Sequence, residues 1–250
     1  MKRPTHEPTA PGNPKDFAID QHVFPKSAIA RFASGNGRVQ TQGMFGVPRM
    51  RAPSEKIFCA QRAWDHSAET YRTIGYEEPY RKLADAIVSG KVKRLSAEQD
   101  DVATLFIALW NARHHARHEP TGDIAMNGVT PMMLTKDQEE NLEKNGVMFA
   151  RGTSMPSRFM TGMRMVRSID FEYEQYRGKH WGIIRSRKAQ FLVPDNVTGF
   201  RWIPVAPHIG LSPDSDEVTI SDEQVAEVNR ISLKCVKEYY FGQNLANCPR

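Results

Sequence analysis

The sequence predicts an α+β protein: a mainly helical single domain with a small antiparallel sheet in its C-terminal half. Two observations lead to this class. Apolar residues recur at helical spacing through the middle of the chain, where capping boxes mark helix starts, and short strand-like segments follow from about residue 180. Because these helices and strands come in separate runs, and not in alternating β-α-β units, an α+β arrangement is favoured over a parallel sheet.

A single globular domain is expected over residues 17–242, between a flexible tail at 1–16 and a short tail at 243–250. The first tail is polar and rich in proline, without the apolar centre of a secretory signal. No apolar run approaches the roughly 18 residues that a membrane helix needs. The 3 cysteines form no Cys-x-x-Cys pair. These features predict a cytoplasmic protein that does not associate with membranes, because free thiols are typical of a reducing compartment.

The N-terminal part of the domain is predicted to contain one short helix followed by extended pieces. Pro25 suits the first turn of a helix, and Ile29 and Phe32 then fall on one face, so residues 26–33 are expected to be helical. The stretch 38–55 is interrupted by glycine and proline, which favours short extended segments over a helix.

The central helices have the clearest signals. An apolar stripe predicts a helix over residues 79–90, with glycine at its end. The capping box Ser-Ala-Glu-Gln at 96–99 begins a longer helix that Pro120 ends. A second capping box starts a short helix over residues 135–146, and residues 155–177 are predicted to be helical.

The C-terminal part of the chain is predicted to hold the sheet and a last helix. The segment HWGIIRSRKAQFLV, residues 180–193, has the pattern of two strands joined by a basic turn at 185–188. Residues 202–212 supply further extended segments, which their prolines restrict to sheet edges or short strands. A third capping box at Ser221 starts a final helix that is expected to run to about Tyr240.

Positive charge is concentrated in one segment of a chain whose net charge is +5. Residues 151–190 contain nine basic residues against three acidic ones, while the rest of the chain is close to neutral. The basic residues are Arg151, Arg158, Arg164, Arg167, Arg177, Lys179, Arg185, Arg187 and Lys188. Two interpretations stay open: a surface that binds phosphates, or a solvated helix face and hairpin. In the first case Arg185, Arg187 and Lys188 are the expected substrate contacts.

The stretch DQHVFPKS, from Asp20 to Ser27, contains the first candidate for chemistry. Its His-Val-x-Pro sequence is similar to the front half of an HNH-type nuclease motif. That resemblance implies that His22 is a general base and that Asp20 is a metal ligand. However, Gln21 stands directly before His22, where that motif has its metal ligand. The alternative, which we favour for His22, is that it fixes the start of the first helix by hydrogen bonding.

A second candidate lies at the end of the long central helix, in the segment RHHARHE. His114 and His118 are four residues apart and share one helix face, a spacing that can hold a divalent ion. No third ligand is evident in the sequence, so a basic, solvated helix end is the favoured interpretation. Arg113 extends the apolar stripe of this helix and needs an acidic partner or an anion, for which Asp195 is our prediction.

Asp195 and Asn196 form the third candidate. Short polar residues directly after a strand make Asx turns, and they also line functional sites at strand ends. We therefore expect one pocket that gathers His22, Arg113, Asp195 and Asn196.

A longer resemblance connects these pieces. Residues 21–32, QHVFPKSAIARF, resemble the N-terminal motif of a bacterial family, domain of unknown function 4238, which reads roughly His-His-Tyr-Val-Pro-x-x-Tyr-Leu-Arg-x-Phe. Later features are similar in order and spacing: Arg113, the segment 193–197, the proline-rich strand 204–212, and Asn229. The resemblance covers roughly residues 18–241 and implies a bacterial protein, but it brings no established activity.

The chain departs from that family pattern at three positions. Gln21 replaces the first histidine, Pro194 replaces a serine, and Val197 replaces a proline. If the family binds a metal through its first histidine, this chain has lost or changed that ligand.

The sequence thus predicts a protein that acts on nucleic acid as a metal-assisted phosphodiesterase or nuclease, with magnesium, manganese or zinc. The expected catalytic residues are His22, Asp195 and Asn196, and Arg113 is expected to contact phosphate. The alternative is a non-catalytic module that binds nucleic acid or a protein, in which the same polar residues form an internal network. Exposure separates the two, because a catalytic site has to reach solvent while a network is buried with its hydrogen bonds satisfied.

Overall fold

The computed structural model describes residues 7–72, 74–119, 122–128, 130 and 133–250. The α-helices in this part of the chain are α1 (Lys26–Ala30), α2 (Ile74–Val88), α3 (Ala97–His118), α4 (Lys136–Lys144), α5 (Ser157–Tyr176) and α6 (Asp222–Cys235). Among the described residues, none of the helices combines the length and apolar character needed to cross a bilayer.

Short strands accompany the helices along most of the chain. They are β1 (Asp20–His22), β2 (Val39–Gly43), β3 (Arg49–Arg51), β4 (Cys59–Gln61), β5 (Ile124–Ala125), β6 (Ser154–Met155), β7 (Trp181–Ser186), β8 (Val193–Pro194), β9 (Ile203–Ala206), β10 (Ile209–Pro213), β11 (Val218–Ile220) and β12 (Tyr239–Gly242).

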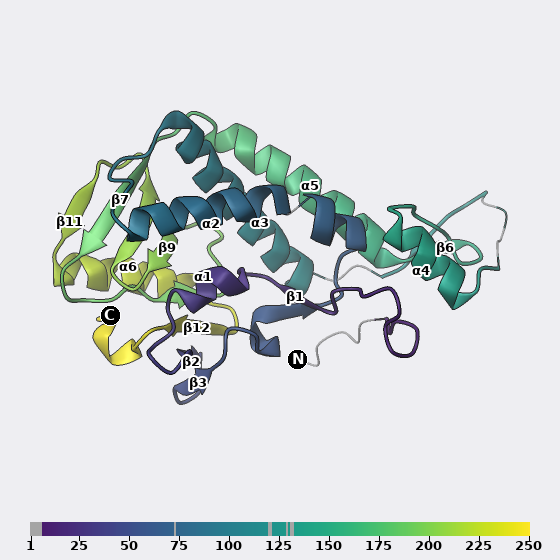
Figure 1. Cartoon of the computed structure of the whole chain (residues 1–250), viewed down its shortest axis with the longest axis horizontal. Coiled ribbons are helices and arrows are strands. Elements are labelled where there is room, and N and C mark those ends of the chain that lie inside the picture. Colours follow the sequence, from purple (N-terminus) through teal and green to yellow (C-terminus); the bar gives the residue numbers. More distant parts are fainter. Residues whose placement is uncertain (1–6, 73, 120–121, 129, 131–132) are drawn as a thin grey trace.

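The long helices form one layer of the molecule. Figure 1 shows α2, α3 and α5 side by side along the long axis, with β1, β2, β3 and β12 below them. The strands β7, β9 and β11 lie with α6 at one end, and α4 lies with β6 at the other. The α+β class is therefore confirmed.

The position of the sheet differs from the prediction. The strands form several small sheets spread across the chain, in the orders β3-β2-β12-β8, β11-β7-β10-β9, β1-β4 and β5-β6. The second sheet is mixed, because β11 runs parallel to β7 while the other neighbours are antiparallel. The prediction of one sheet confined to the C-terminal half was therefore wrong. It failed because pairing between strands far apart in sequence leaves no local pattern.

The helix α3 lies at the centre of the core. Its capping box is formed as predicted: Ser96 accepts a hydrogen bond from the Gln99 backbone, and the Gln99 side chain accepts one from Ser96. Phe106 stacks on Tyr80 of α2. The ring of Phe24, just before α1, lies 4.4 Å from that of Trp110. The residues next to His22 thus anchor the N-terminal segment to α3 through a buried aromatic contact.

The last helix ends earlier than predicted. It stops at Cys235, and the following residues turn into β12, which pairs with β2 and β8. Tyr239 and Tyr240, which were predicted to end the helix, are buried in this strand. A short apolar run does not separate these two outcomes by itself.

Both predicted tails make specific contacts where they are described. Glu7 pairs with Arg151 at 2.5 Å, and the backbone of Ala10 donates to Glu140 at 2.7 Å. At the other end Leu245 and Cys248 are buried. Residues 7–16, which were predicted to belong to a flexible tail, therefore contact the domain through specific groups, and residues 243–250 pack against it. Polar composition alone did not reveal their buried ionic and apolar partners.

Candidate metal centre

Two histidines of α3 face the same way at the C-terminal end of the helix. The rings of His114 and His118 have centroids 4.3 Å apart, as the i, i+4 spacing predicts. His114 is buried and His118 is half-buried. The end of α3 therefore offers two imidazoles at one place, one of them accessible from solvent.

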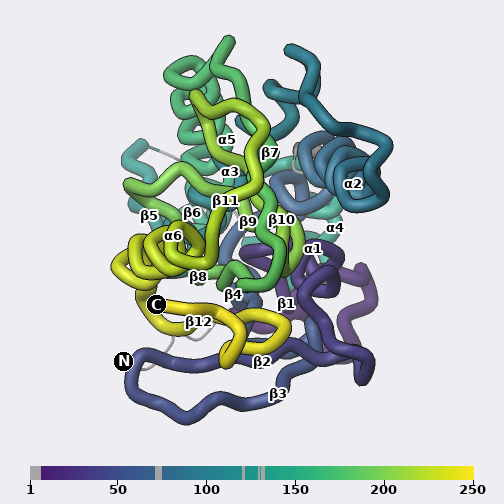
Figure 2. Tube along the Cα trace, turned by 90° about the vertical axis from the view of Figure 1, so that its left-hand side faces the viewer, coloured from purple at the N-terminus to yellow at the C-terminus, as the bar shows by residue number. Residues whose placement is uncertain are grey.

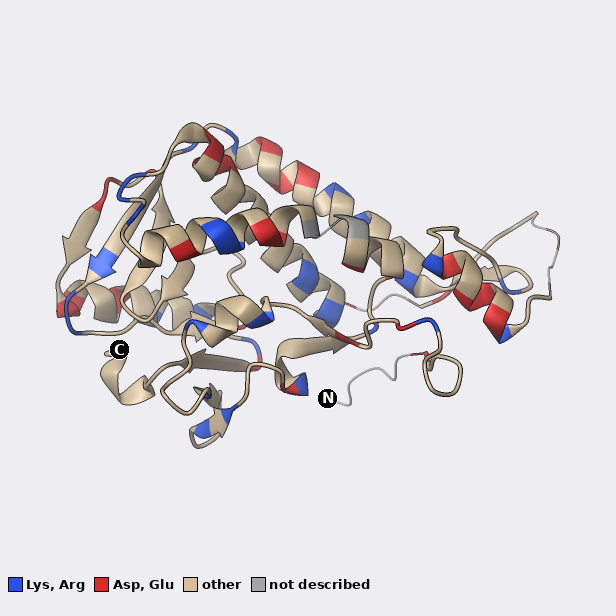
Figure 3. Ribbon diagram, in the orientation of Figure 1, with Lys and Arg blue, Asp and Glu red and all other residues tan. Residues whose placement is uncertain are grey.

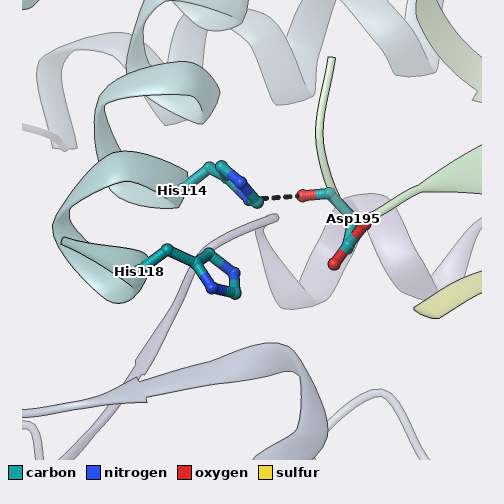
Figure 4. A group of neighbouring side chains, drawn as sticks. All are labelled: His114, His118 and Asp195. Atoms are coloured by element: carbon teal, nitrogen blue, oxygen red, sulfur yellow. Dashed lines mark hydrogen bonds between the residues drawn. The ribbon is translucent and has the colours of Figure 1, made fainter. Parts of the chain in front are cut away.

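Asp195 completes a group of three potential metal ligands. It follows β8 directly and is 5% exposed. Within the described chain, one ligand atom each from His114, His118 and Asp195 lie within 4.8 Å of one another. Figure 4 shows both rings on the side of α3 that faces the Asp195 loop. Three side chains from two distant segments thus converge.

The proton on His114 can be placed from its partner. Its Nδ1 lies 3.0 Å from the backbone oxygen of Asp195, as the dashed line in Figure 4 marks. A carbonyl oxygen only accepts, so Nδ1 carries the proton. Burial, with the neighbouring His118 and His115, lowers the pKa of His114 to about 3. The ring is therefore neutral at pH 7, and Nε2 keeps a lone pair. A backbone carbonyl on the other ring nitrogen is a common partner of metal-binding histidines.

The carboxylate of Asp195 is held by the backbone that follows α6. It accepts hydrogen bonds from the N–H groups of Lys237 at 2.9 Å, Glu238 at 2.7 Å and Tyr239 at 3.4 Å. Burial raises the pKa of Asp195, and these hydrogen bonds oppose that shift. Oδ2 accepts two of these bonds and Oδ1 accepts one, so Oδ1 retains a lone pair with which the carboxylate can cap this turn and still bind an ion.

Two imidazoles and one carboxylate suit a divalent ion such as zinc or manganese. In tetrahedral zinc sites with bonds of about 2.0–2.1 Å, ligand atoms are roughly 3.3 Å apart. The ligand atoms of His114, His118 and Asp195 lie within 4.8 Å of one another, so they need to move only slightly closer together to bind zinc.

His22 and Asp20 do not contribute to this group. The Nε2 atom of His22 lies 3.0 Å from the backbone oxygen of Pro53, and burial lowers its pKa. Asp20 is exposed and accepts a hydrogen bond from Gln61. The buried amide of Gln21 makes two hydrogen bonds with the Trp64 backbone. This stretch is built as a strand end that packs against Trp64, which agrees with the structural interpretation of His22.

The predicted partner of Arg113 was wrong. Arg113 pairs with Glu77 at 2.5 Å and lies 3.9 Å from Glu69. Its side chain is 2% exposed, so it cannot contact a bound phosphate from its present position. The side-chain hydrogen bonds of Asp195 go to the residues after α6, whereas the charge of Arg113 acts on His22. A pocket that gathers His22, Arg113, Asp195 and Asn196 stays a prediction.

The amide of Asn196 is occupied by local structure. Its Oδ1 accepts from the backbone and the hydroxyl of Thr198, and its Nδ2 donates to the backbone oxygen of Cys235. This is the Asx turn that the sequence offered as an alternative. Asn196 therefore shapes the loop beside Asp195, and a catalytic role for its amide is not supported.

The basic segment is partly neutralised in the fold. Arg151 and Arg158 pair with Glu7, Arg177 lies near Glu174, and Lys179 pairs with Asp214. Figure 3 shows basic and acidic positions close together along the ribbon of α4 and α5. If the basic residues of 151–190 form a phosphate-binding surface, ion pairs therefore interrupt it at these four residues.

Three predicted substrate contacts, Arg185, Arg187 and Lys188, lie at or just after the end of β7. Arg185 is half-buried and donates to the backbone oxygen of Ile87 at 3.3 Å. Arg187 and Lys188 are exposed in the turn that follows. For these two residues contact with nucleic acid stays a prediction.

The third ligand was the part of the site that sequence reasoning missed. The helical spacing of His114 and His118 was visible, and Asp195 was already a candidate for another role. Their meeting depends on a contact across 77–81 residues of sequence, for which no local pattern gives a signal.

Comparison with known proteins adds nothing to this geometry: no protein-family model, curated protein or solved structure matches the chain.

Proposed function

We propose that the protein binds a divalent metal ion at His114, His118 and Asp195 and acts on nucleic acid as a metal-assisted phosphodiesterase. The observation that carries this proposal is the convergence of the three ligand atoms within 4.8 Å. Three protein ligands leave a position for water or substrate, which is typical of catalytic zinc sites, whereas structural zinc sites have four. An ion held in this way stabilises charge on a phosphate and lowers the pKa of a bound water.

Access to the centre supports the same proposal. His118 is half-buried, so a substrate would approach from its side of the cluster. Lys237, whose backbone N–H holds the Asp195 carboxylate, has an exposed side chain. Arg117 supplies a cation whose charge acts on His114, and it also pairs with Glu238.

A second candidate function is a non-catalytic module in which the cluster has a structural role. Asp195 already accepts three backbone N–H groups, as a residue that shapes the chain does. Two surface hollows of the described chain are lined by residues other than these ligands. In this case a metal ion would stabilise the fold and no bond would be cleaved.

A cleavage assay distinguishes the two functions. The purified protein is incubated with single- and double-stranded DNA and RNA, with magnesium, manganese, zinc or a chelator. The test variant is His118→Ala, because His118 is half-buried and its removal perturbs packing least. The matched control is His115→Ala, a neighbouring histidine whose side chain is exposed.

The proposed activity predicts metal-dependent cleavage that His118→Ala abolishes and His115→Ala retains. Metal binding without cleavage of any substrate would favour the non-catalytic module. Cleavage that His118→Ala leaves unchanged would place the activity elsewhere on the chain.

A further inference from the structure

The hairpin formed by β2 and β3 lies at one edge of the molecule. Figure 1 and Figure 2 both show it at the bottom of the view, below α2, α3 and α5. The strand β3 is also the outermost strand of its sheet. Residues 44–48, which connect the two strands and which we call the hairpin tip, therefore protrude from the body of the protein.

The hairpin tip presents large apolar side chains to solvent. Phe45 is 98% exposed, Val47 is 71% exposed and Met44 is 55% exposed. Met50, in the adjoining strand β3, is 40% exposed. Single apolar residues on a surface are ordinary, whereas a contiguous group of them is typical of an interaction site. The tip is therefore a candidate for contact with another molecule.

The shape of the tip is held by its own hydrogen bonds. The backbone N–H of Gly46 donates to the backbone oxygen of Gly43 at 3.2 Å. The side-chain amide of Gln42 donates to the backbone oxygen of Gly46 at 3.0 Å. Pro48 restricts the backbone at the other end of the tip. Because the turn is already ordered, binding through its apolar side chains costs less conformational entropy.

The charge around the tip is positive. Residues 34–55 contain three arginines and a single acidic residue, Glu55. Glu55 pairs with Arg51 at 2.7 Å and lies 3.7 Å from Arg38. Arg49 is exposed, and no acidic residue of the described chain forms an ion pair with it. Figure 3 shows basic positions and no acidic ones on the ribbon of β3. A partner with a negatively charged surface therefore complements this hairpin.

The surface of an anionic bilayer matches both the apolar tip and the positive charge. Apolar side chains enter the boundary between headgroups and acyl chains, and basic side chains beside them attract anionic headgroups. Nucleic acid could pair with the arginines and stack on Phe45, but it would leave Met44 and Val47 in water. An acidic protein would need a recess shaped for the protruding tip, whereas lipids rearrange around it.

We propose that the hairpin tip inserts into the surface of membranes that contain anionic lipids, with Arg49 on the headgroups. The sequence-based prediction of no membrane association depended on the lack of a membrane-spanning run. Insertion of a loop into one leaflet does not require such a run. This surface is separate from the metal ligands and does not depend on the proposed hydrolysis.

The binding test is co-sedimentation of the full chain with lipid vesicles in EDTA, so that no metal ion bridges protein and lipid. The vesicles consist of phosphatidylcholine alone or of phosphatidylcholine and phosphatidylserine in equal parts. The test variants are Phe45→Ser and Arg49→Gln, whose exposed side chains can be replaced without disturbing the core. The matched controls are Phe171→Ser, since Phe171 is 67% exposed on α5, and Lys93→Gln, which removes the same charge from another exposed position. Circular dichroism checks that all four variants fold.

We expect the chain to bind the mixed vesicles and to bind those of phosphatidylcholine alone much more weakly. Phe45→Ser should weaken binding at least about fivefold through the lost apolar burial, and Arg49→Gln should weaken it about threefold to fivefold. Both controls should bind like the unchanged protein. Absence of binding to the mixed vesicles, or an equal loss in Phe45→Ser and Phe171→Ser, would overturn the proposal. Binding of single-stranded RNA that Phe45→Ser removes, without binding of vesicles, would mean base stacking and would overturn it equally.

Discussion

The Nδ1 atom of His114 lies 3.0 Å from the backbone oxygen of Asp195, which joins the end of α3 to the loop after β8. This bond fixes the tautomer of the histidine and turns Nε2 away from it as a free acceptor. It also explains why the two ligand-bearing segments meet. The position of the loop is secured in turn by the Asp195 carboxylate, which binds the backbone after α6.

Acid stability provides a first test of the buried His114. Its pKa is lowered from 6.5 to about 3, so the ring binds a proton less readily in the folded protein than in the unfolded chain. Stability from this group is present above pH 6.5 and is lost as the pH falls toward 3. The expected loss is on the order of a few kcal/mol. Urea unfolding of the metal-free protein at several pH values measures it.

The variant His114→Gln should unfold with a weaker dependence on pH in this range, because glutamine does not titrate. Its amide can still donate to the Asp195 carbonyl. The same slope in both proteins would show that another group is responsible.

The ion pair between Arg113 and Glu77 is predicted to be structural. Replacing Glu77 by Gln should destabilise the protein by about 2 kcal/mol, because a buried guanidinium loses its nearest charge partner. The exposed pair of Arg81 and Glu78 is the comparison, and Arg81→Ala should destabilise the protein much less than Glu77→Gln. Chemical unfolding provides both values, and equal effects would contradict the buried role of Arg113.

Glu7 is predicted to hold the N-terminal segment against α4 and α5. Burial opposes its ionisation, but hydrogen bonds from Arg151 and Lys136 and the charge of Arg158 lower the pKa of Glu7 to about 2. Its stabilising effect is present above pH 4.5 and is lost as the pH falls toward 2. We expect Glu7→Gln to cost about 1–3 kcal/mol and to speed proteolysis of residues 7–16.

The matched control for Glu7→Gln is Glu174→Gln. The exposed ion pair that Glu174 forms with Arg177, at 3.8 Å, contributes little to stability. Unchanged proteolysis of the Glu7 variant would mean that other contacts hold this segment.

Gly210 is predicted to be required by the packing of Trp202. A Cβ atom at this position would lie 2.2 Å from the indole ring, so Gly210→Ala should destabilise the protein by about 1–3 kcal/mol. At Gly35 nothing lies within 4 Å, and Gly35→Ala should change stability by less than about 0.5 kcal/mol. Thermal unfolding tests both, and a neutral Gly210→Ala would show that the Trp202 ring can shift.

Local sequence signals predicted the helices well and the long-range pairings poorly. The capping box at Ser96 marked the start of α3 correctly, because its hydrogen bonds lie within four residues. The end of α6 was missed because Tyr239 and Phe241 enter a strand whose partners come from β2 and β8. The partners in β2 are about 200 positions away and those in β8 are 46–48 positions away, and local periodicity gives no information about either pairing.

The candidate site shows the same limit. The spacing of His114 and His118 follows from helix geometry and was visible in the sequence. The third ligand was assigned to the wrong partner, since a buried Arg113 indicates that an acid is needed without indicating which one. Glu77 satisfied that need, and Asp195 remained for the histidines.

The most direct test of the account is calorimetric titration of the metal-free protein with zinc and manganese. The protein, His118→Ala and the control His115→Ala are compared under the same conditions. The account predicts that one ion binds per chain, that His118→Ala weakens this binding at least about tenfold, and that His115→Ala does not change it. Absence of binding, or equal binding by His118→Ala and the unchanged protein, would contradict a metal centre at His114, His118 and Asp195.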